Sequence, residues 1–126
     1  GSTADDVMNR LWVNLAAGLP AMFGFTVYSS IDAAWDTGCI PFPSSRERIR
    51  GGHAVCAVGY DDDLIITNPH NGQSTKGAFL IRNSWGTDWG DNGYGWLPYD
   101  YLYAGLADDW WSLIESTWID TGEFSV

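Results

Sequence analysis

The residues of this sequence best suited to chemistry are a histidine and an asparagine at the ends of two apolar runs. His53 follows two glycines and opens the run 53–60, whereas Asn83 closes the run 78–83. An asparagine at the end of a strand can accept a hydrogen bond from an imidazole N–H, which fixes the tautomer and the direction of the ring. Taken separately, each residue also has a structural explanation, because a lone histidine is usually a packing residue and an asparagine often begins a turn.

A tryptophan and several glycines follow the asparagine closely. Trp85 lies two residues after Asn83, where it could cover a contact between the asparagine and the histidine. Such a cover would exclude water and strengthen the hydrogen bond. The glycines of the stretch 86–95 permit a tight loop and a close approach of the backbone.

The two segments together, in this order, resemble the papain-like cysteine peptidases. The matching motifs are Gly-His-Ala-Val at 52–55 and Arg-Asn-Ser-Trp-Gly-x-x-Trp-Gly-x-x-Gly-Tyr at 82–94. The similarity extends more loosely over roughly residues 5–120, which resemble the C-terminal, β-rich half of such an enzyme.

The resemblance implies a role for each matched residue. His53 would pair with a nucleophilic thiolate and protonate the leaving amine, and Asn83 would orient its ring in a Cys-His-Asn triad. Trp85 would shield the bond between them, and Trp89 would lie near the primed side of the cleft. The motif neighbours expected to support the site are Gly52 and Ser84. The family cleaves peptides and proteins by acyl transfer through a thioester, so we expect a peptide or protein substrate and no metal or organic cofactor.

The nucleophile of this family is missing from the sequence. It normally lies in a Cys-Gly-Ser/Ala-Cys-Trp/Tyr stretch roughly 130–150 residues before the histidine, which places it before residue 1. Cys56 lies within an apolar strand as an inert hydrophobe, and Cys39 lies in a loop without a partner that would activate it. We therefore expect an inactive isolated chain and a complementary N-terminal half that carries the catalytic cysteine. A solitary half would self-associate or swap domains through its bare apolar face.

One helix followed by several strands is predicted to position these residues. Apolar residues recur at helical spacing over 5–17, between a capping position at Thr3 and Gly18. Strands are predicted at 21–28, 53–60, 64–67, 78–83 and 93–97, with loops at 29–52 and 68–77 and with the acidic run 61–63 ending the second strand. The tail 110–119 fits either an extended or a helical conformation. This order predicts an α+β domain with an antiparallel, partly closed β-barrel, which the resemblance identifies as the right-hand half of the papain-like fold.

The composition excludes several classes of function. The 126 residues carry 6 basic and 16 acidic side chains, a net charge of −10, and 15% of them are aromatic. Nucleic acids and anionic membrane surfaces require basic patches, and the one basic cluster is Arg46, Arg48 and Arg50, so we expect neither partner. The aromatic content excludes a disordered chain, and no apolar run approaches the roughly 20 residues that span a bilayer. Residues 1–4 are interpreted as an expression scar and linker, and residues 5–126 as one domain.

Other functions fit parts of the sequence. A non-catalytic pseudo-peptidase or protein-binding module would keep the scaffold without the chemistry, although the retained histidine, asparagine and tryptophan argue against it. A carbohydrate-binding domain would use Trp110, Trp111 and Trp118 for stacking, but packing in a small core explains these aromatics more simply. The carboxylates of 61–63 could bind calcium, yet no calcium-loop spacing follows them.

Overall fold

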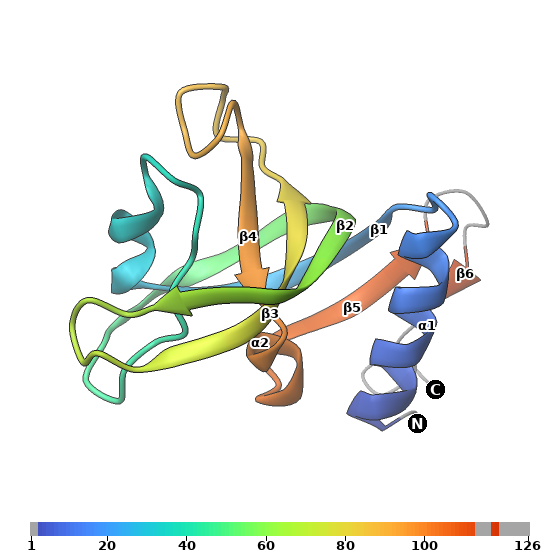
Figure 1. The fold of residues 1–126 in the computed structure, drawn as a ribbon, viewed down its shortest axis with the longest axis horizontal. Coiled ribbons are helices and arrows are strands. Elements are labelled where there is room, and N and C mark those ends of the chain that lie inside the picture. The colour runs from blue at the N-terminus through green and yellow to red at the C-terminus, as the bar shows by residue number, and fades with distance from the viewer. Residues whose placement is uncertain (1–2, 113–116, 119–126) are drawn as a thin grey trace.

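The computed structural model describes residues 3–112 and 117–118 and places one helix beside an antiparallel sheet (Figure 1). Within these residues the sheet has 6 strands in the order β4-β3-β2-β1-β5-β6. The strands are β1 (Ala21–Tyr28), β2 (Ile49–Thr67), β3 (Ser74–Arg82), β4 (Tyr94–Pro98), β5 (Ala107–Ser112) and β6 (Thr117–Trp118). The predicted α+β class with its N-terminal helix and antiparallel sheet is confirmed, and the described strands form an open sheet that does not close into a barrel.

Helix α1 (Ala4–Ala16) begins and ends where the sequence predicts to within one residue. The hydroxyl of Thr3 accepts a hydrogen bond from the backbone N–H of Asp6, and the carboxylate of Asp6 accepts one from the N–H of Thr3. This reciprocal pair is a capping box. After the helix, Gly18 has a φ of 81°, a conformation that favours glycine. The buried face of α1 consists of Val7, Met8, Leu11 and Leu15.

Strand β2 continues through the acidic run that was predicted to end it. Asp61 pairs with Ala78 and Ile65 with Lys76, so β2 advances by 65 − 61 = 4 residues while β3 advances by 78 − 76 = 2. Such a bulge absorbs the extra residues without ending the ladder. The segment 64–67 is therefore part of β2, and the prediction of a separate third strand there is wrong.

Other segments add to the sequence-based expectation or differ from it. The predicted loop 29–52 contains a short 3₁₀ helix, η1 (Ser29–Ala34), and the end of this loop already belongs to β2. A short helix, α2 (Asp100–Tyr103), follows β4. The described part of the tail is extended, because β5 pairs with β1 and β6 with β5. No helix in the described ranges has the length and apolar character needed to cross a membrane.

Aromatic rings from the strands and from Tyr99, just before α2, pack together in the core. Phe23 stacks on Trp110 with ring centroids 3.9 Å apart, and Phe79 contacts the edge of Tyr99 at 4.8 Å. Trp110 is only 1% exposed, so it is a core residue and cannot serve as a carbohydrate-stacking surface. The side chains of Trp111 and Trp118, named with it in that hypothesis, lie outside the described part of the structure.

Glu47 ties the loop before β2 to the turn that joins β2 and β3. Its carboxylate accepts hydrogen bonds from the backbone N–H of Ser30 at 2.8 Å, the N–H of Ser44 at 2.7 Å and the side-chain amide of Asn68 at 2.8 Å. Burial by itself raises the pKa of this carboxyl group, but the hydrogen bonds outweigh it and lower the pKa of Glu47 to about 2. The ionised carboxylate is therefore a structural element of this loop.

This lowered pKa predicts a pH-dependent contribution to stability. Because the folded pKa lies below the ordinary value of 4.5, the stabilisation is complete above about pH 4.5 and disappears as the pH falls toward about 2. We expect Glu47→Gln to lower the free energy of unfolding by about 1–3 kcal/mol at neutral pH, and the difference from the parent chain to shrink on acidification. Urea unfolding across this pH range, monitored by tryptophan fluorescence, measures the difference in the free energy of unfolding.

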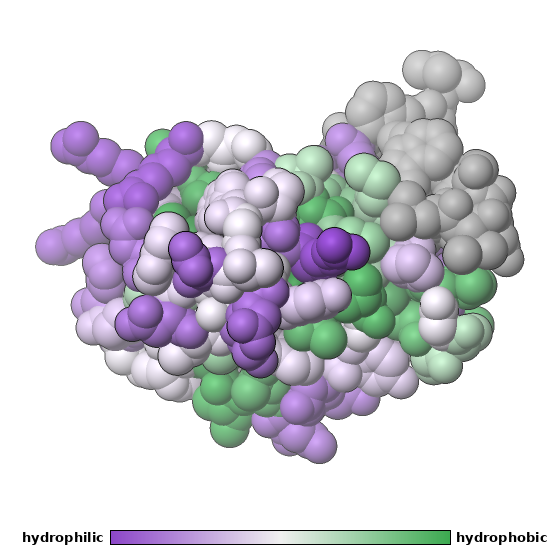
Figure 2. All heavy atoms as spheres, turned by 90° about the horizontal axis from the view of Figure 1, so that it is seen from above, coloured by the Kyte–Doolittle hydropathy of each residue, from purple (hydrophilic) through white to green (hydrophobic). Residues whose placement is uncertain are grey.

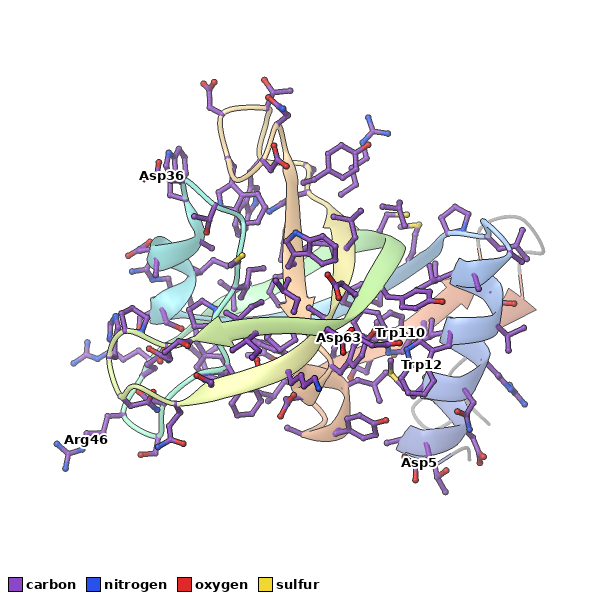
Figure 3. All side chains as sticks on the ribbon, in the orientation of Figure 1. Asp5, Trp12, Asp36, Arg46, Asp63 and Trp110 are labelled. Carbon is purple, nitrogen blue, oxygen red and sulfur yellow. The ribbon has the colours of Figure 1, made fainter. Side chains whose placement is uncertain are left out.

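Asp36→Asn is the matched control for the loss of one negative charge, because Asp36 lies exposed at the surface near η1 (Figure 3). If the free energy of unfolding of Glu47→Gln differed from that of the parent chain by the same amount at neutral and at acidic pH, this account of Glu47 would be contradicted.

Candidate active site

The structure brings the predicted histidine and asparagine into direct contact. His53 lies in β2, and Asn83 is the first residue after β3. The Nε2 atom of His53 lies 2.7 Å from the Oδ1 atom of Asn83. An amide oxygen can only accept, so Nε2–H is the donor, and Nδ1 remains as the basic nitrogen of the neutral ring.

The register of β2 and β3 explains why these residues meet. Cys56 pairs with Arg82 at the end of the ladder. If the same antiparallel register continues beyond the pair of Cys56 and Arg82, residue 83 lies beside residue 55 and Trp85 lies beside His53. The backbone N–H of Asn83 donates to the carbonyl of Gly93 at 2.9 Å, which fixes the asparagine as the chain enters the loop 83–93.

Two aromatic rings enclose the imidazole. Trp85 stacks on His53 with ring centroids 4.4 Å apart and an interplanar angle of 24°. Phe25, from the neighbouring strand β1, meets the imidazole edge-on at 6.1 Å and 74°. Asn83 is 7% exposed, whereas Trp85 is 39% exposed and forms the outer cover. Water is thus largely kept from the hydrogen bond, which strengthens it.

Trp89 supports Trp85 from below and is itself held by glycines. The two indole rings meet edge-to-face at 5.5 Å and 87°, and Trp89 is 1% exposed. A Cβ atom at Gly95 would lie 2.5 Å from the ring of Trp89, and a Cβ atom at Gly38 would lie 2.6 Å from a backbone carbonyl oxygen of β4. Because glycine has no side chain at these two positions, the loop 83–93 can lie close to the segment after η1. Both project from the same end of the sheet (Figure 1).

A hollow of about 390 Å³ opens beside the imidazole. We call it the aromatic hollow. Its lining consists of Val27, Ile31, Asp32, Trp35, Arg50, Gly51, Gly52, His53, Trp85 and Trp89. Arg50 and Asp32 form a bidentate ion pair there, with two hydrogen bonds of 2.7 Å. Hydrogen bonding from Arg50 lowers the pKa of Asp32 below its ordinary value. Arg46, from the same basic cluster, instead points away from the molecule (Figure 3).

The two supporting motif residues take different positions. Gly52 pairs with Thr26 of β1, and a Cβ atom there would meet nothing within 4 Å, so the approach to His53 is open on this side. Ser84 is exposed and lines a separate hollow on the outer face of the sheet.

The two cysteines lie in different surroundings. His53 and Cys56 are three residues apart on β2, so their side chains leave opposite faces of the sheet. Burial raises the pKa of the Cys56 thiol, which the charge of Arg82 offsets only in part. Cys39 lies in a loop that bridges to Trp96 of β4. Across the ranges 3–112 and 117–118, no three histidine, cysteine or carboxylate side chains gather as a metal site would require.

Some residues of the site carry no recognisable sequence signal. Phe25, Trp35 and the partnership of Arg50 with Asp32 depend on contacts between distant segments, and sequence reasoning did not assign them a role. The pairing of Arg50 with Asp32 depends on an irregularity in the register of β1 and β2, which no local sequence pattern predicts.

Comparisons with known proteins give the same classification as the motifs. A model of the papain family of cysteine proteases matches residues 2–110. A peptidase C1-like protein of Acanthamoeba polyphaga mimivirus is 37% identical over 119 residues, which are 92% of this chain and 34% of that protein. Procathepsin L of Felis catus is 38% identical over 93 residues, which are 68% of this chain and 24% of that protein.

A solved structure agrees as well. Xylellain, a cysteine protease from Xylella fastidiosa, has a TM-score of 0.66 and 40% sequence identity, over 82% of this chain and 35% of the xylellain chain. This chain thus spans between a quarter and about a third of the length of these relatives. Since the family model covers well over half of its residues, the chain belongs to the papain family of cysteine proteases.

Proposed function

We propose that this chain supplies the histidine and the orienting asparagine of a Cys-His-Asn triad that cleaves peptide bonds. The observation that carries the proposal is the 2.7 Å hydrogen bond from His53 Nε2 to Asn83 Oδ1 beneath Trp85. A packing role alone does not require an imidazole with a fixed tautomer and one nitrogen left available for proton transfer. This argues against the alternative of a non-catalytic binding module on the same scaffold.

The proposed chemistry uses the nitrogen of His53 that Asn83 leaves free. Nδ1 takes the proton of a cysteine thiol, and the resulting thiolate attacks the carbonyl carbon of the peptide bond. When the carbon–nitrogen bond breaks, the imidazolium returns this proton to the departing amine, and a thioester remains. His53 then takes a proton from water as the water attacks the thioester, and it protonates the released thiolate. Asn83 holds the ring direction throughout, so it is a positioning residue.

In this proposal the nucleophile belongs to a complementary half, which must approach the free nitrogen of His53. A separate apolar surface lies on the opposite, outer face of the sheet. Met22 pairs with Cys56, and Gly24 with Ala54, across β1 and β2. These four residues, which we call the outer patch, are small or apolar and lie on the face opposite the buried core. A solvated face of an antiparallel sheet normally carries polar residues. On the face that Figure 2 shows, hydrophobic residues lie at the surface beside hydrophilic ones.

The proposal predicts which substitutions abolish catalysis in an assembled enzyme. We would join this chain to the remaining, cysteine-bearing segment of a papain-family relative and measure kcat/KM on a fluorogenic peptide amide. His53→Ala should reduce kcat/KM by about 10²–10⁴-fold, because it removes the proton carrier. Asn83→Ala should cause a smaller loss, because the ring remains but is no longer oriented.

The matched controls are His70→Ala, in the exposed turn after β2, and Asn9→Ala, on the exposed side of α1. Both should keep the parental rate. Circular dichroism and size-exclusion chromatography establish whether each variant is folded and assembled. A folded His53→Ala enzyme with the parental kcat/KM would refute the proposal.

The isolated chain is predicted to self-associate through the outer patch. Sedimentation velocity at increasing concentration should show species larger than a monomer, because this apolar surface is exposed to water. Met22→Asp should weaken the association by placing a charge in the patch. Val13→Asp is the matched control, since Val13 is 69% exposed on α1 and lies outside the patch. A parent chain that stays monomeric at the highest concentration would contradict this prediction.

A further inference from the structure

A second hollow, of about 490 Å³, lies between the loop before β2 and the turn that joins β2 and β3. These two segments lie side by side at the left of Figure 1. We call it the serine hollow, and its lining includes Ser29, Ser44, Ser45, Arg46, His70 and Asn71. Every residue of the lining has a polar side chain, and none of them belongs to the aromatic hollow. The serine hollow is therefore suited to a polar occupant.

The hydrogen-bond acceptors around the serine hollow are largely occupied by the protein itself. Both carboxylate oxygens of Glu47, which also belongs to the lining, accept hydrogen bonds from N–H groups. The Oδ1 atom of Asn71 accepts a hydrogen bond of 2.9 Å from the N–H of Gln73. The Oδ1 atom of Asn68 accepts one of 2.8 Å from the N–H of His70. A cation would find few unused lone pairs here.

The donors of the serine hollow are unused. Within residues 3–112 and 117–118, no group bonds to the three serine hydroxyls or to the side-chain NH₂ of Asn71. Arg46 has no carboxylate partner in this part of the chain, whereas Arg50 pairs with Asp32. The side chain of Arg46 extends into solvent (Figure 3), and its rotatable bonds allow it to turn back over an occupant. A surplus of donors beside an unpaired guanidinium favours an acceptor-rich anion.

The buried side chain of Asn68 holds the walls of the serine hollow together. It is 0% exposed, and its NH₂ group donates to the carbonyl of Phe42 at 2.9 Å and to Glu47 at 2.8 Å. Its backbone carbonyl accepts a hydrogen bond of 2.8 Å from the N–H of Gly72. The loop before β2 and the turn after it are thus joined before any ligand arrives, and such preorganisation lowers the entropic cost of binding.

We propose that the serine hollow binds a phosphate group, either as the free anion or as an ester on a larger molecule. A phosphate ester presents three strong acceptor oxygens and about two negative charges near neutral pH, which matches the unused hydroxyls and the guanidinium. Serine hydroxyls and arginine are common phosphate ligands in proteins. The charge of Glu47 is offset by the three N–H groups that bind it, so it opposes the anion less than an unbonded carboxylate would.

A ¹⁵N NMR titration of this chain, observed through its backbone amide signals, tests the proposal without a catalytic partner. The probes are inorganic phosphate, N-acetyl-O-phosphoserine amide and acetate, all at one ionic strength because salt screens such contacts. Both phosphate probes should shift the signals of residues 44–47 and 70–71 and reach saturation. Acetate should bind about tenfold more weakly, because it presents fewer oxygens and less charge. Tighter binding of the phosphoserine amide assigns the hollow to an ester, and tighter binding of inorganic phosphate assigns it to the free anion.

Three results of this titration would overturn the proposal. Equal binding of phosphate and acetate would reduce the effect to general attraction of anions. Saturable shifts of the same signals by calcium chloride, but not by phosphate, would identify a cation site instead. Shifts that do not saturate with either phosphate probe would show that the hollow has no affinity for this group.

Variants assign the binding to the residues of the hollow. Arg46→Ala should weaken phosphate binding by about tenfold, and Arg46→Lys should retain part of the affinity because it keeps the charge. Ser44→Ala should cause a smaller loss, since its backbone N–H still binds Glu47. The matched control is Arg10→Ala, which removes the same charge from the exposed side of α1 and should leave the affinity unchanged. Equal losses in Arg46→Ala and Arg10→Ala would refute a site in the serine hollow.

Discussion

The hydrogen bond between His53 and Asn83 imposes the strictest geometric requirement on this chain. Its two partners are 30 residues apart in sequence and 2.7 Å apart in space. They meet only if β2 and β3 pair in one register, because a shift of one residue would turn the histidine or the asparagine to the other face of the sheet. The bulge at the acidic run lies further along the ladder, so the extra residues there leave the pairing next to His53 and Asn83 undisturbed.

The rest of the site serves to keep this bond dry and its ring in place. Phe25 connects the imidazole to the aromatic core, where it also contacts the edge of Tyr101. On the outer side, Trp85 rests on Trp89, and Trp89 occupies space that exists because Gly95 has no side chain. A hydrogen bond between polar groups contributes little to stability when water competes for both groups, and it contributes more when water is excluded. Gly95 of β4 and the two tryptophans of the loop 83–93 therefore act together in covering this bond.

The sequence predicts the parts of this fold that local chemistry controls. Thr3 and Gly18 mark the ends of α1, and the motifs around His53 and Asn83 identify the two residues that meet. The parts that were missed depend on distant contacts. The acidic run was predicted to end a strand, but pairing with β3 carries β2 through it, and the carboxylate of Asp62 accepts a hydrogen bond from Tyr99. The bulge that turns Arg50 toward Asp32 likewise exists only because β1 lies beside β2.

The central claim is that Asn83 fixes the tautomer of His53, and ¹⁵N NMR of the histidine rings tests it most directly. The chain has two histidines, so exposed His70 provides an internal comparison in the same spectrum. The account predicts that neutral His53 carries its proton on Nε2 and that Asn83→Ala abolishes this preference. A proton on Nδ1, or rapid averaging of both nitrogens as expected for an exposed ring, would contradict it.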